Sequence, residues 1–130
     1  AAVNLALNLI YVSNLGSGTV SVISGFSNSV VDTITGLTTP ESVGVNPNSN
    51  RVYVSSASST VSVIDGNTNT IIATVPVGTL PLGLAVNNLT NGIYTSNALS
   101  STVSVIDGNS NTLTATITVG SGPNSIAVNP

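Results

Sequence analysis

Short apolar runs alternate with polar clusters along the whole chain. Within the runs the side-chain pattern has a period of two, as in Thr60–Asp65, where Val61 and Val63 alternate with Ser62 and Ile64. Such β-branched, alternating segments are typical of strands on a pleated, half-buried surface. The clusters between them are rich in Asn, Asp, Gly and Pro, which favour turns. No window has helical periodicity with caps, so we expect almost no helix.

The middle of the chain shows the pattern most clearly. Its turn clusters include Asn46–Asn50 and Asp65–Asn69, and each lies between two apolar runs. The strands predicted there are Glu41–Asn46, Arg51–Ser55, Thr60–Asp65 and Thr70–Val77. Four short strands joined by tight turns predict one small antiparallel sheet.

The same four-strand pattern occurs three times. Tyr11, Tyr53 and Tyr94 are 42 and 41 residues apart, and each begins a Tyr-(Val/Thr)-Ser-(Asn/Ser) segment. A Thr-Val-Ser-Val-Ile-(Ser/Asp)-Gly segment follows in every repeat, and its glycines are Gly25, Gly66 and Gly108. Internal repeats of this length with four strands each are typical of β-propeller blades. A β-solenoid is the alternative, but its coils are usually shorter and need fewer turns.

The predicted fold is therefore all-β, with three four-stranded antiparallel repeats of about 42 residues in a single domain, residues 1–130. We place the blades at about 2–37, 41–78 and 82–120, with a surplus strand at 124–130. Propellers close with about four to eight blades. Three blades are too few, so we expect a half-propeller that another subunit completes.

The sequence of the repeats resembles that of the YVTN family of β-propeller repeat proteins. The resemblance is carried by Tyr11-Val12-Ser13-Asn14, by the Thr-Val-Ser-Val-Ile segments and by the Ala-Val-Asn-Pro ending at Pro130. It covers essentially the whole chain, and it implies a propeller fold and an extracellular, surface-layer-type location. This chain departs from the family pattern in having almost no charge and a single arginine, Arg51.

The two ends of the chain match each other. Ala2-Val3-Asn4 aligns with Ala127-Val128-Asn129, so both ends lie in the first strand of a blade. We expect the surplus strand to pair with a neighbouring copy, because an unpaired sheet edge is a template for strand addition. Such copies form either a closed ring, for example of two chains, or an open head-to-tail filament.

The first turn of the chain is unusually apolar. Leu5 and Leu7 stand in the columns that hold Pro47 and Ser49 in the second repeat. We expect this segment to be buried against another subunit. The residues predicted to form the subunit interface are Ala2, Val3, Leu5, Leu7, Ser125, Ile126 and Val128.

Composition narrows the possible chemistry. Charged residues make up 4% of the chain, with four acids and one base, and Lys, His, Cys, Met and Trp are absent. Nucleic-acid binding needs several cations, and membrane insertion by a helix needs roughly 20 consecutive apolar residues. We therefore expect neither, and we expect no disulfide, zinc site or histidine base.

The acidic residues resemble parts of known sites, but the sequence predicts structural roles for them. The loops starting at Asp65 and Asp107 resemble the first half of a calcium loop but lack its later glycine and glutamate, so we predict hairpin turns. We expect no carboxylate pair among the acids, including Asp32 and Glu41, to be catalytic, because none is predicted to have the spacing that glycoside hydrolysis needs. We predict no catalytic residue, metal or cofactor.

The aromatic residues and the single base have structural interpretations as well. A ring made by the three tyrosines would suit a sugar-binding protein, but we expect them to pack between blades with the hydroxyl at the edge. Arg51 is expected to form an ion pair with Glu41 or Asp65. Asn88-Leu89-Thr90 is the one N-glycosylation sequon.

The sequence thus favours a non-enzymatic extracellular structural protein whose main partner is itself, secreted with its signal peptide already removed. A surface of Ser, Thr and Asn repels its own copies little, so self-association should depend little on salt. The alternative is an adhesin or lectin-like module that binds glycans or proteins.

Overall fold

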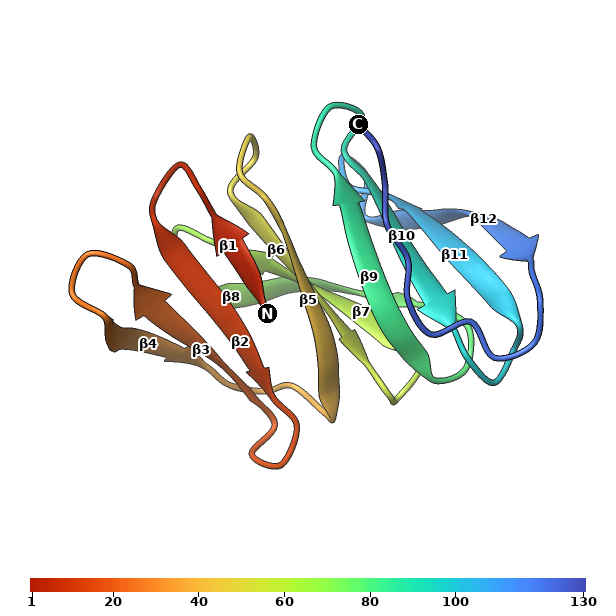
Figure 1. Cartoon of the computed structure of the whole chain (residues 1–130), viewed down its shortest axis with the longest axis horizontal. Helices are drawn as coiled ribbons and strands as arrows, with labels where there is room; N and C mark the ends of the chain where they lie inside the picture. The colour runs from red at the N-terminus through yellow and green to blue at the C-terminus, as the bar shows by residue number, and fades with distance from the viewer.

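The computed structural model describes residues 1–130 and contains twelve strands in three four-stranded sheets (Figure 1). We call the sheets blades 1, 2 and 3. Blade 1 comprises β1 (Ala2–Asn4), β2 (Leu9–Asn14), β3 (Thr19–Ser24) and β4 (Ser29–Ile34). Blade 2 comprises β5 (Pro40–Asn46), β6 (Arg51–Ser56), β7 (Thr60–Asp65) and β8 (Thr70–Pro76). Blade 3 comprises β9 (Pro81–Asn87), β10 (Gly92–Asn97), β11 (Thr102–Asp107) and β12 (Thr112–Thr118).

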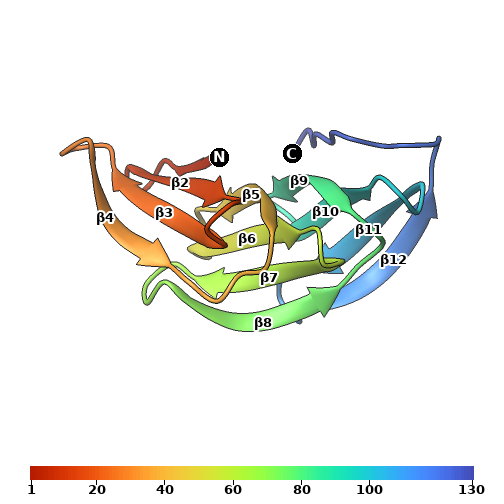
Figure 2. The same ribbon diagram turned by 90° about the horizontal axis from the view of Figure 1, so that it is seen from below.

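The strands of each blade pair antiparallel in sequence order. The blades fan out side by side, with β4, β8 and β12 along the outer rim and both chain ends on the opposite, inner side (Figure 2). This arrangement confirms the predicted partial propeller of three blades. The predicted strands of blade 2 match the observed ones to within one residue at each end. The structure contains no helix that is long and apolar enough to cross a bilayer.

Two apolar cores lie between the blades, because each sheet has one apolar face toward each neighbour. The first core joins blades 1 and 2, and the second joins blades 2 and 3. The buried residues of the first are Tyr11, Val20, Val22, Ile34, Leu37, Val43, Val52, Val54 and Ile64. Those of the second are Tyr53, Val61, Val63, Val75, Ile93 and Ile106.

A left-handed asparagine immediately precedes the second strand of every blade. Asn8, Asn50 and Asn91 have φ of 51°, 48° and 56°, a region that asparagine tolerates better than most residues. Their carbonyls accept hydrogen bonds from the N–H groups of Gly25, Gly66 and Gly108, at 2.8–2.9 Å. The repeated Asn and Gly columns therefore tie the first turn of each blade to its third turn.

The surplus strand predicted at 124–130 is not a strand, and this prediction is corrected. The segment has no strand partner, because no second strand of a fourth blade is present to complete its hydrogen bonds. It nevertheless runs beside β9 toward the β9–β10 turn (Figure 1). A Cβ placed on Gly83 of β9 would lie 2.9 Å from the carbonyl oxygen of Asn124 and 3.1 Å from the Cα of Ser125. We call residues 123–130 the C-terminal tail.

Candidate functional site

The strands β7 and β11 have the same six-residue sequence, Thr-Val-Ser-Val-Ile-Asp, but different surroundings. In β7 all four central side chains are buried. In β11 the equivalent Ser104 and Ile106 are buried, whereas Val103 and Val105 are half-exposed. The difference comes only from neighbours, because blade 2 has a blade on each side and blade 3 lacks one on the side of the two valines. That side is an apolar face without a partner.

The open face of blade 3 is formed by the residues that are equivalent, in the repeat, to the blade 2 residues that pack on blade 3. It is only partly covered, by the C-terminal tail. Its residues are Tyr94, Val103, Val105 and Ile117, which match Tyr53, Val61, Val63 and Val75 of the second core. All four are half-exposed or exposed, while the matching residues of blade 2 are buried.

The open face of blade 1 is the complementary surface. The equivalent residues of blade 2 pack on blade 1, and they belong to the first core or border it. The residues of the open face of blade 1 are Val3, Ile10, Val12, Ile23 and Val30, which match Val45, Val52, Val54, Ile64 and Ile71. Apart from single exposed residues, soluble domains rarely expose contiguous apolar surface without using it. The chain therefore presents both halves of its own blade–blade interface, one at each end.

A ladder of asparagines crosses the two internal interfaces. The Asn4 side-chain amide donates to Asn50 Oδ1 at 2.9 Å, and that of Asn46 donates to Asn91 Oδ1 at 2.7 Å. Each donor ends the first strand of one blade, and each acceptor is the left-handed asparagine of the next blade. The equivalent asparagine of blade 3 is Asn87. Its Oδ1 accepts turn hydrogen bonds from the N–H groups of Leu89 and Thr90, and its side-chain amide donates to no other residue.

In blade 1, Asn8 is the equivalent of the acceptor asparagines Asn50 and Asn91, and it receives no hydrogen bond of this kind. In blades 2 and 3 the left-handed asparagines also donate, to Asn67 and Asn109 within the same blade. In blade 1 the corresponding position holds Phe26, which follows Gly25 as Asn67 follows Gly66. Asn8 consequently has neither a ladder donor from a preceding blade nor an asparagine acceptor in its own blade. Its side chain is free to accept a new hydrogen bond.

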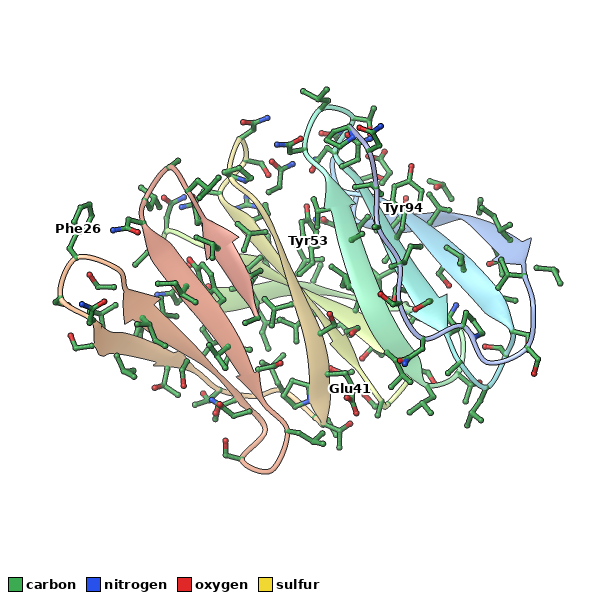
Figure 3. The ribbon with its side chains drawn as sticks, viewed as in Figure 1. Phe26, Glu41, Tyr53 and Tyr94 are labelled. Atoms are coloured by element: carbon green, nitrogen blue, oxygen red, sulfur yellow. The ribbon has the colours of Figure 1, made fainter.

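The predicted interface residues fall into two groups. Leu5 is 84% exposed and Leu7 is 45% exposed, both at the β1–β2 turn of blade 1, with Val3 beside them. Phe26, also 84% exposed, lies in the β3–β4 turn at the same end of that blade (Figure 3). Sequence reasoning did not select Phe26, although its polar counterparts in the other two repeats were a usable signal. The prediction that Leu5 and Leu7 are buried by a subunit stays a prediction.

The second group lies in the C-terminal tail. Ile126 and Val128 are half-buried, whereas Ser125 and Ala127 are exposed. This alternation matches Leu84 and Val86 of β9, which pack toward the preceding blade. The structure thus places the tail residues on blade 3 and the N-terminal residues on blade 1, and it does not bring the two groups together within one chain.

The Asp65 and Asp107 loops are hydrogen-bonded turns, as predicted. Asp65 Oδ1 accepts from the N–H of Asn67, and Asp107 Oδ1 accepts from the N–H of Asn109, each at 2.9 Å. These N–H bonds are the main reason that the pKa of each carboxyl group is lowered. No group of three or more His, Cys, Asp or Glu side chains is close enough together to hold a metal ion.

The remaining charged residues stabilise surface contacts. Arg51 forms the predicted ion pair with Asp65, with 3.0 Å between Nη1 and Oδ1. Asp32 Oδ2 accepts from the Asn69 amide of blade 2 at 2.7 Å, and this bond is the largest cause of the lowered pKa of Asp32. Because all these groups are at least partly exposed, each contributes little to stability.

Tyr11 and Tyr53 are fully buried, so the predicted packing role is confirmed and neither ring is available to stack on a sugar. Burial also raises the pKa of both phenols. The expected position of the hydroxyl at the edge is wrong for Tyr11, whose hydroxyl is buried and has no hydrogen-bond partner. Tyr94 is only half-buried, on the open face of blade 3 (Figure 3).

Asn88 of the glycosylation sequon lies in the β9–β10 turn and is half-buried. Its carbonyl oxygen accepts a hydrogen bond from the side chain of Asn48 in blade 2, at 2.9 Å.

Solved structures with the same arrangement of strands are β-propellers. The chain superposes on hydrazine synthase of Kuenenia stuttgartiensis with a TM-score of 0.89, at 22% identity over 95% of this chain and 36% of that one. It superposes on AztD of Citrobacter koseri with a TM-score of 0.76, at 22% identity over 92% of this chain and 34% of that one. The WD40 β-propeller domain of Doa1 gives a TM-score of 0.73, at 14% identity over 88% of this chain and 38% of that one.

These likenesses establish the fold alone, because all the identities are below a quarter. The chain spans about a third of the length of each of these proteins. No protein-family model and no curated protein sequence matches it. The chain is a three-bladed β-propeller segment whose two outermost blades each leave an interblade face open.

Proposed function

We propose that this chain is a non-enzymatic structural protein of the cell exterior, of the YVTN repeat type, that assembles head to tail with copies of itself. The open face of blade 3 of one copy packs on the open face of blade 1 of the next. The observation that carries the proposal is the pair of identical strands β7 and β11. The valines that blade 2 buries completely are left half-exposed in blade 3.

Charge and composition support the same function. The net charge of −3 and the low charged fraction allow copies to approach with little electrostatic repulsion. Seryl and threonyl hydroxyls are abundant, but the chain has no histidine or lysine to activate one as a nucleophile. A surface of uncharged polar residues also suits an extracellular layer, sheath or filament.

The test compares charged substitutions on the two open faces. Val105→Asp on blade 3 and Ile23→Asp on blade 1 should each reduce the mass in solution to that of a single chain, 12.9 kDa, while the unmodified chain has a multiple of it. Leu99→Asp is the matched control, since Leu99 is 72% exposed at a turn outside both faces. Light scattering after gel filtration measures all four masses.

A mixture of the two face variants makes the test directional. Val105→Asp leaves the blade 1 face intact, and Ile23→Asp leaves the blade 3 face intact. Head-to-tail packing therefore predicts a two-chain complex in the mixture, although each variant alone is a single chain. Variants that assemble like the unmodified chain, or a mixture that stays as single chains, would contradict the proposed function.

A further inference from the structure

Asn91 differs from the other two left-handed asparagines in the residue that follows it. Asn8 and Asn50 are followed by a leucine and an arginine, whereas Asn91 is followed by Gly92. Asn91-Gly92 is the one Asn-Gly pair in the sequence. It lies between blades 2 and 3, because Asn91 is the acceptor of the ladder hydrogen bond that joins these two blades.

An asparagine that precedes a glycine is prone to lose its side-chain amide. The deprotonated main-chain nitrogen of the glycine attacks Cγ of the asparagine, a Cγ–N bond forms, the Cγ–Nδ2 bond breaks, and the side-chain nitrogen leaves as ammonia. Water then opens the succinimide ring at one of its two carbonyl carbons and gives aspartate or isoaspartate. One water is taken up and one ammonia is released, so no oxidant is needed. Glycine favours ring closure because it has no side chain and a flexible backbone.

In the folded chain both ends of the Asn91 amide are hydrogen-bonded. Its Oδ1 accepts from the Asn46 amide at 2.7 Å, and its Nδ2 donates to Asn109 Oδ1 at 3.1 Å. The main-chain carbonyl of Asn91 accepts from the N–H of Gly108 at 2.8 Å. Gly92 is paired with β9 on one side and with β11 on the other. Since ring closure expels Nδ2, it has to break the hydrogen bond to Asn109.

We propose that Asn91-Gly92 is a deamidation site that the asparagine ladder protects and that reacts when the contact between blades 2 and 3 opens. The inference goes beyond the proposed function and does not depend on assembly. Asn91 and Gly92 are both half-buried, so water reaches the ring once it has formed. Local opening limits the rate, because parts of a fold open at a lower free energy than the whole.

The product of the reaction weakens the same contact. An aspartate at position 91 would place an oxygen opposite Asn109 Oδ1, where the amide now donates, and the Asn109 amide already donates to Asp107 Oδ1 at 3.1 Å. Asn109 would then lie between two carboxylates. An isoaspartate would add one atom to the main chain directly before β10 and displace the carbonyl that Gly108 bonds. Deamidation therefore loosens the interface between blades 2 and 3 irreversibly.

The test follows the amide at position 91 by peptide mapping and mass spectrometry during incubation at mildly alkaline pH. The intact folded chain is compared with a free peptide of residues 86–97, which has the same Asn-Gly pair without the ladder. We expect the folded chain to lose the amide more slowly than the peptide, by a factor of about ten or more. Equal rates would overturn protection by the ladder, and a peptide that keeps its amide would overturn the site itself.

Gly92→Ala is the control for the chemistry. Gly92 has no positive φ, so alanine can adopt the same backbone conformation. Its Cβ would lie 3.2 Å from the Tyr94 hydroxyl oxygen and 3.3 Å from Thr90 Oγ1, which small shifts of these side chains relieve. Both the chain and the peptide with this change should keep the amide longer than the unmodified ones. An unchanged rate would contradict attack by the nitrogen of Gly92.

A matched pair of variants isolates the ladder. Asn109→Ala removes the acceptor of the Asn91 amide, and Asn67→Ala removes the equivalent acceptor of the Asn50 amide in blade 2. Both positions are exposed in turns, so both variants should fold. Asn109→Ala should speed the loss of the amide about fivefold, which corresponds to one hydrogen bond of about 1 kcal/mol, and Asn67→Ala should leave it unchanged. Equal rates in the two variants would contradict the proposal.

The separated product tests the effect on the interface. The chain has four acids and one base, so one additional negative charge allows ion exchange to separate the modified chain. It should melt at a lower temperature than the unmodified chain. Equal melting temperatures would contradict the weakening of the contact between blades 2 and 3.

Discussion

Blade 2 and blade 3 show what a neighbouring blade does to one and the same sequence. Their third strands are identical, but β7 is buried on both faces and β11 on one. Blade 2 lies between the other two blades (Figure 2). The propensity, pattern and turns of the two strands are equal, so the difference lies in packing alone. Blade 1 is the mirror case, since its β3 buries Val20 and Val22 and leaves Ile23 half-exposed. Blade 2 therefore has both faces covered by neighbouring blades, whereas blades 1 and 3 each have one apolar face that a partner can cover.

The largest expected effect contrasts two isoleucines in the same column. Ile64→Ala removes a fully buried side chain from the first core, and we expect it to lower the free energy of unfolding by about 3 kcal/mol. Ile23→Ala should cost about 1 kcal/mol in dilute, unassembled protein, because Ile23 already contacts solvent. Urea unfolding measures both. Equal losses would show that blade 1 has no open face.

The asparagine ladder provides the second contrast. Asn46→Ala removes a buried amide that bonds Asn91 across the interface, and we expect a loss of about 2 kcal/mol. Asn87→Ala removes only turn hydrogen bonds in the single chain, so its cost should be about 0.5 kcal/mol. In the assembled protein Asn87→Ala should also raise the concentration at half-assembly, by about tenfold. If light-scattering titrations show an unchanged concentration at half-assembly, Asn87 does not contribute to the contact between copies.

A smaller effect tests the close approach of β5 and β9. A Cβ on Gly44 would overlap Leu84 Cδ2 and would lie 2.8 Å from Val86 Cγ2, so Gly44→Ala forces two side chains to move. Leu84 Cδ2 is the end of a flexible side chain and can move aside, whereas Val86 Cγ2 is held by the branch at Cβ, and we expect a loss of about 1 kcal/mol. Gly16→Ala is the control, because nothing lies within 4 Å of its Cβ position. Thermal unfolding that shows the same loss for both would contradict tight packing of the inner strands.

The smallest effect is the response to pH. The lowered pKa values of Asp32, Asp65 and Asp107 stabilise the folded chain above the ordinary value of 3.8, and this contribution is lost as pH falls through the folded values. The raised pKa values of Tyr11 and Tyr53 destabilise the fold as pH rises above 10.0. Between about pH 5 and 9 the melting temperature should be nearly constant. A step near neutral pH would contradict this account, since the chain has no histidine.

The blades were predictable because their information is local. Alternating Val and Ser in Thr60–Asp65 and the Asn and Gly turn columns each fix a strand or turn without reference to distant residues. The sequence predicted an ion pair of Arg51 with Glu41 or Asp65, and the structure shows Asp65 as the partner, since Arg51 and Asp65 start and end adjacent strands.

The features that were missed depend on neighbours. The tail has the sequence of a first strand but is not one, because a strand exists only with a partner. The exposure of Val105 and the burial of Val63 cannot be read from identical hexapeptides. The unpaired hydroxyl of Tyr11 and the exposed Phe26 likewise depend on what the adjacent blade supplies.

The most direct test of the central claim is the molar mass of the unmodified chain across a concentration series, measured by sedimentation or light scattering. If the open faces of blades 1 and 3 cover each other, the mass rises from 12.9 kDa to a multiple of it, and the rise is nearly the same at about 20 mM and about 500 mM salt. A constant mass of one chain at all concentrations would contradict it.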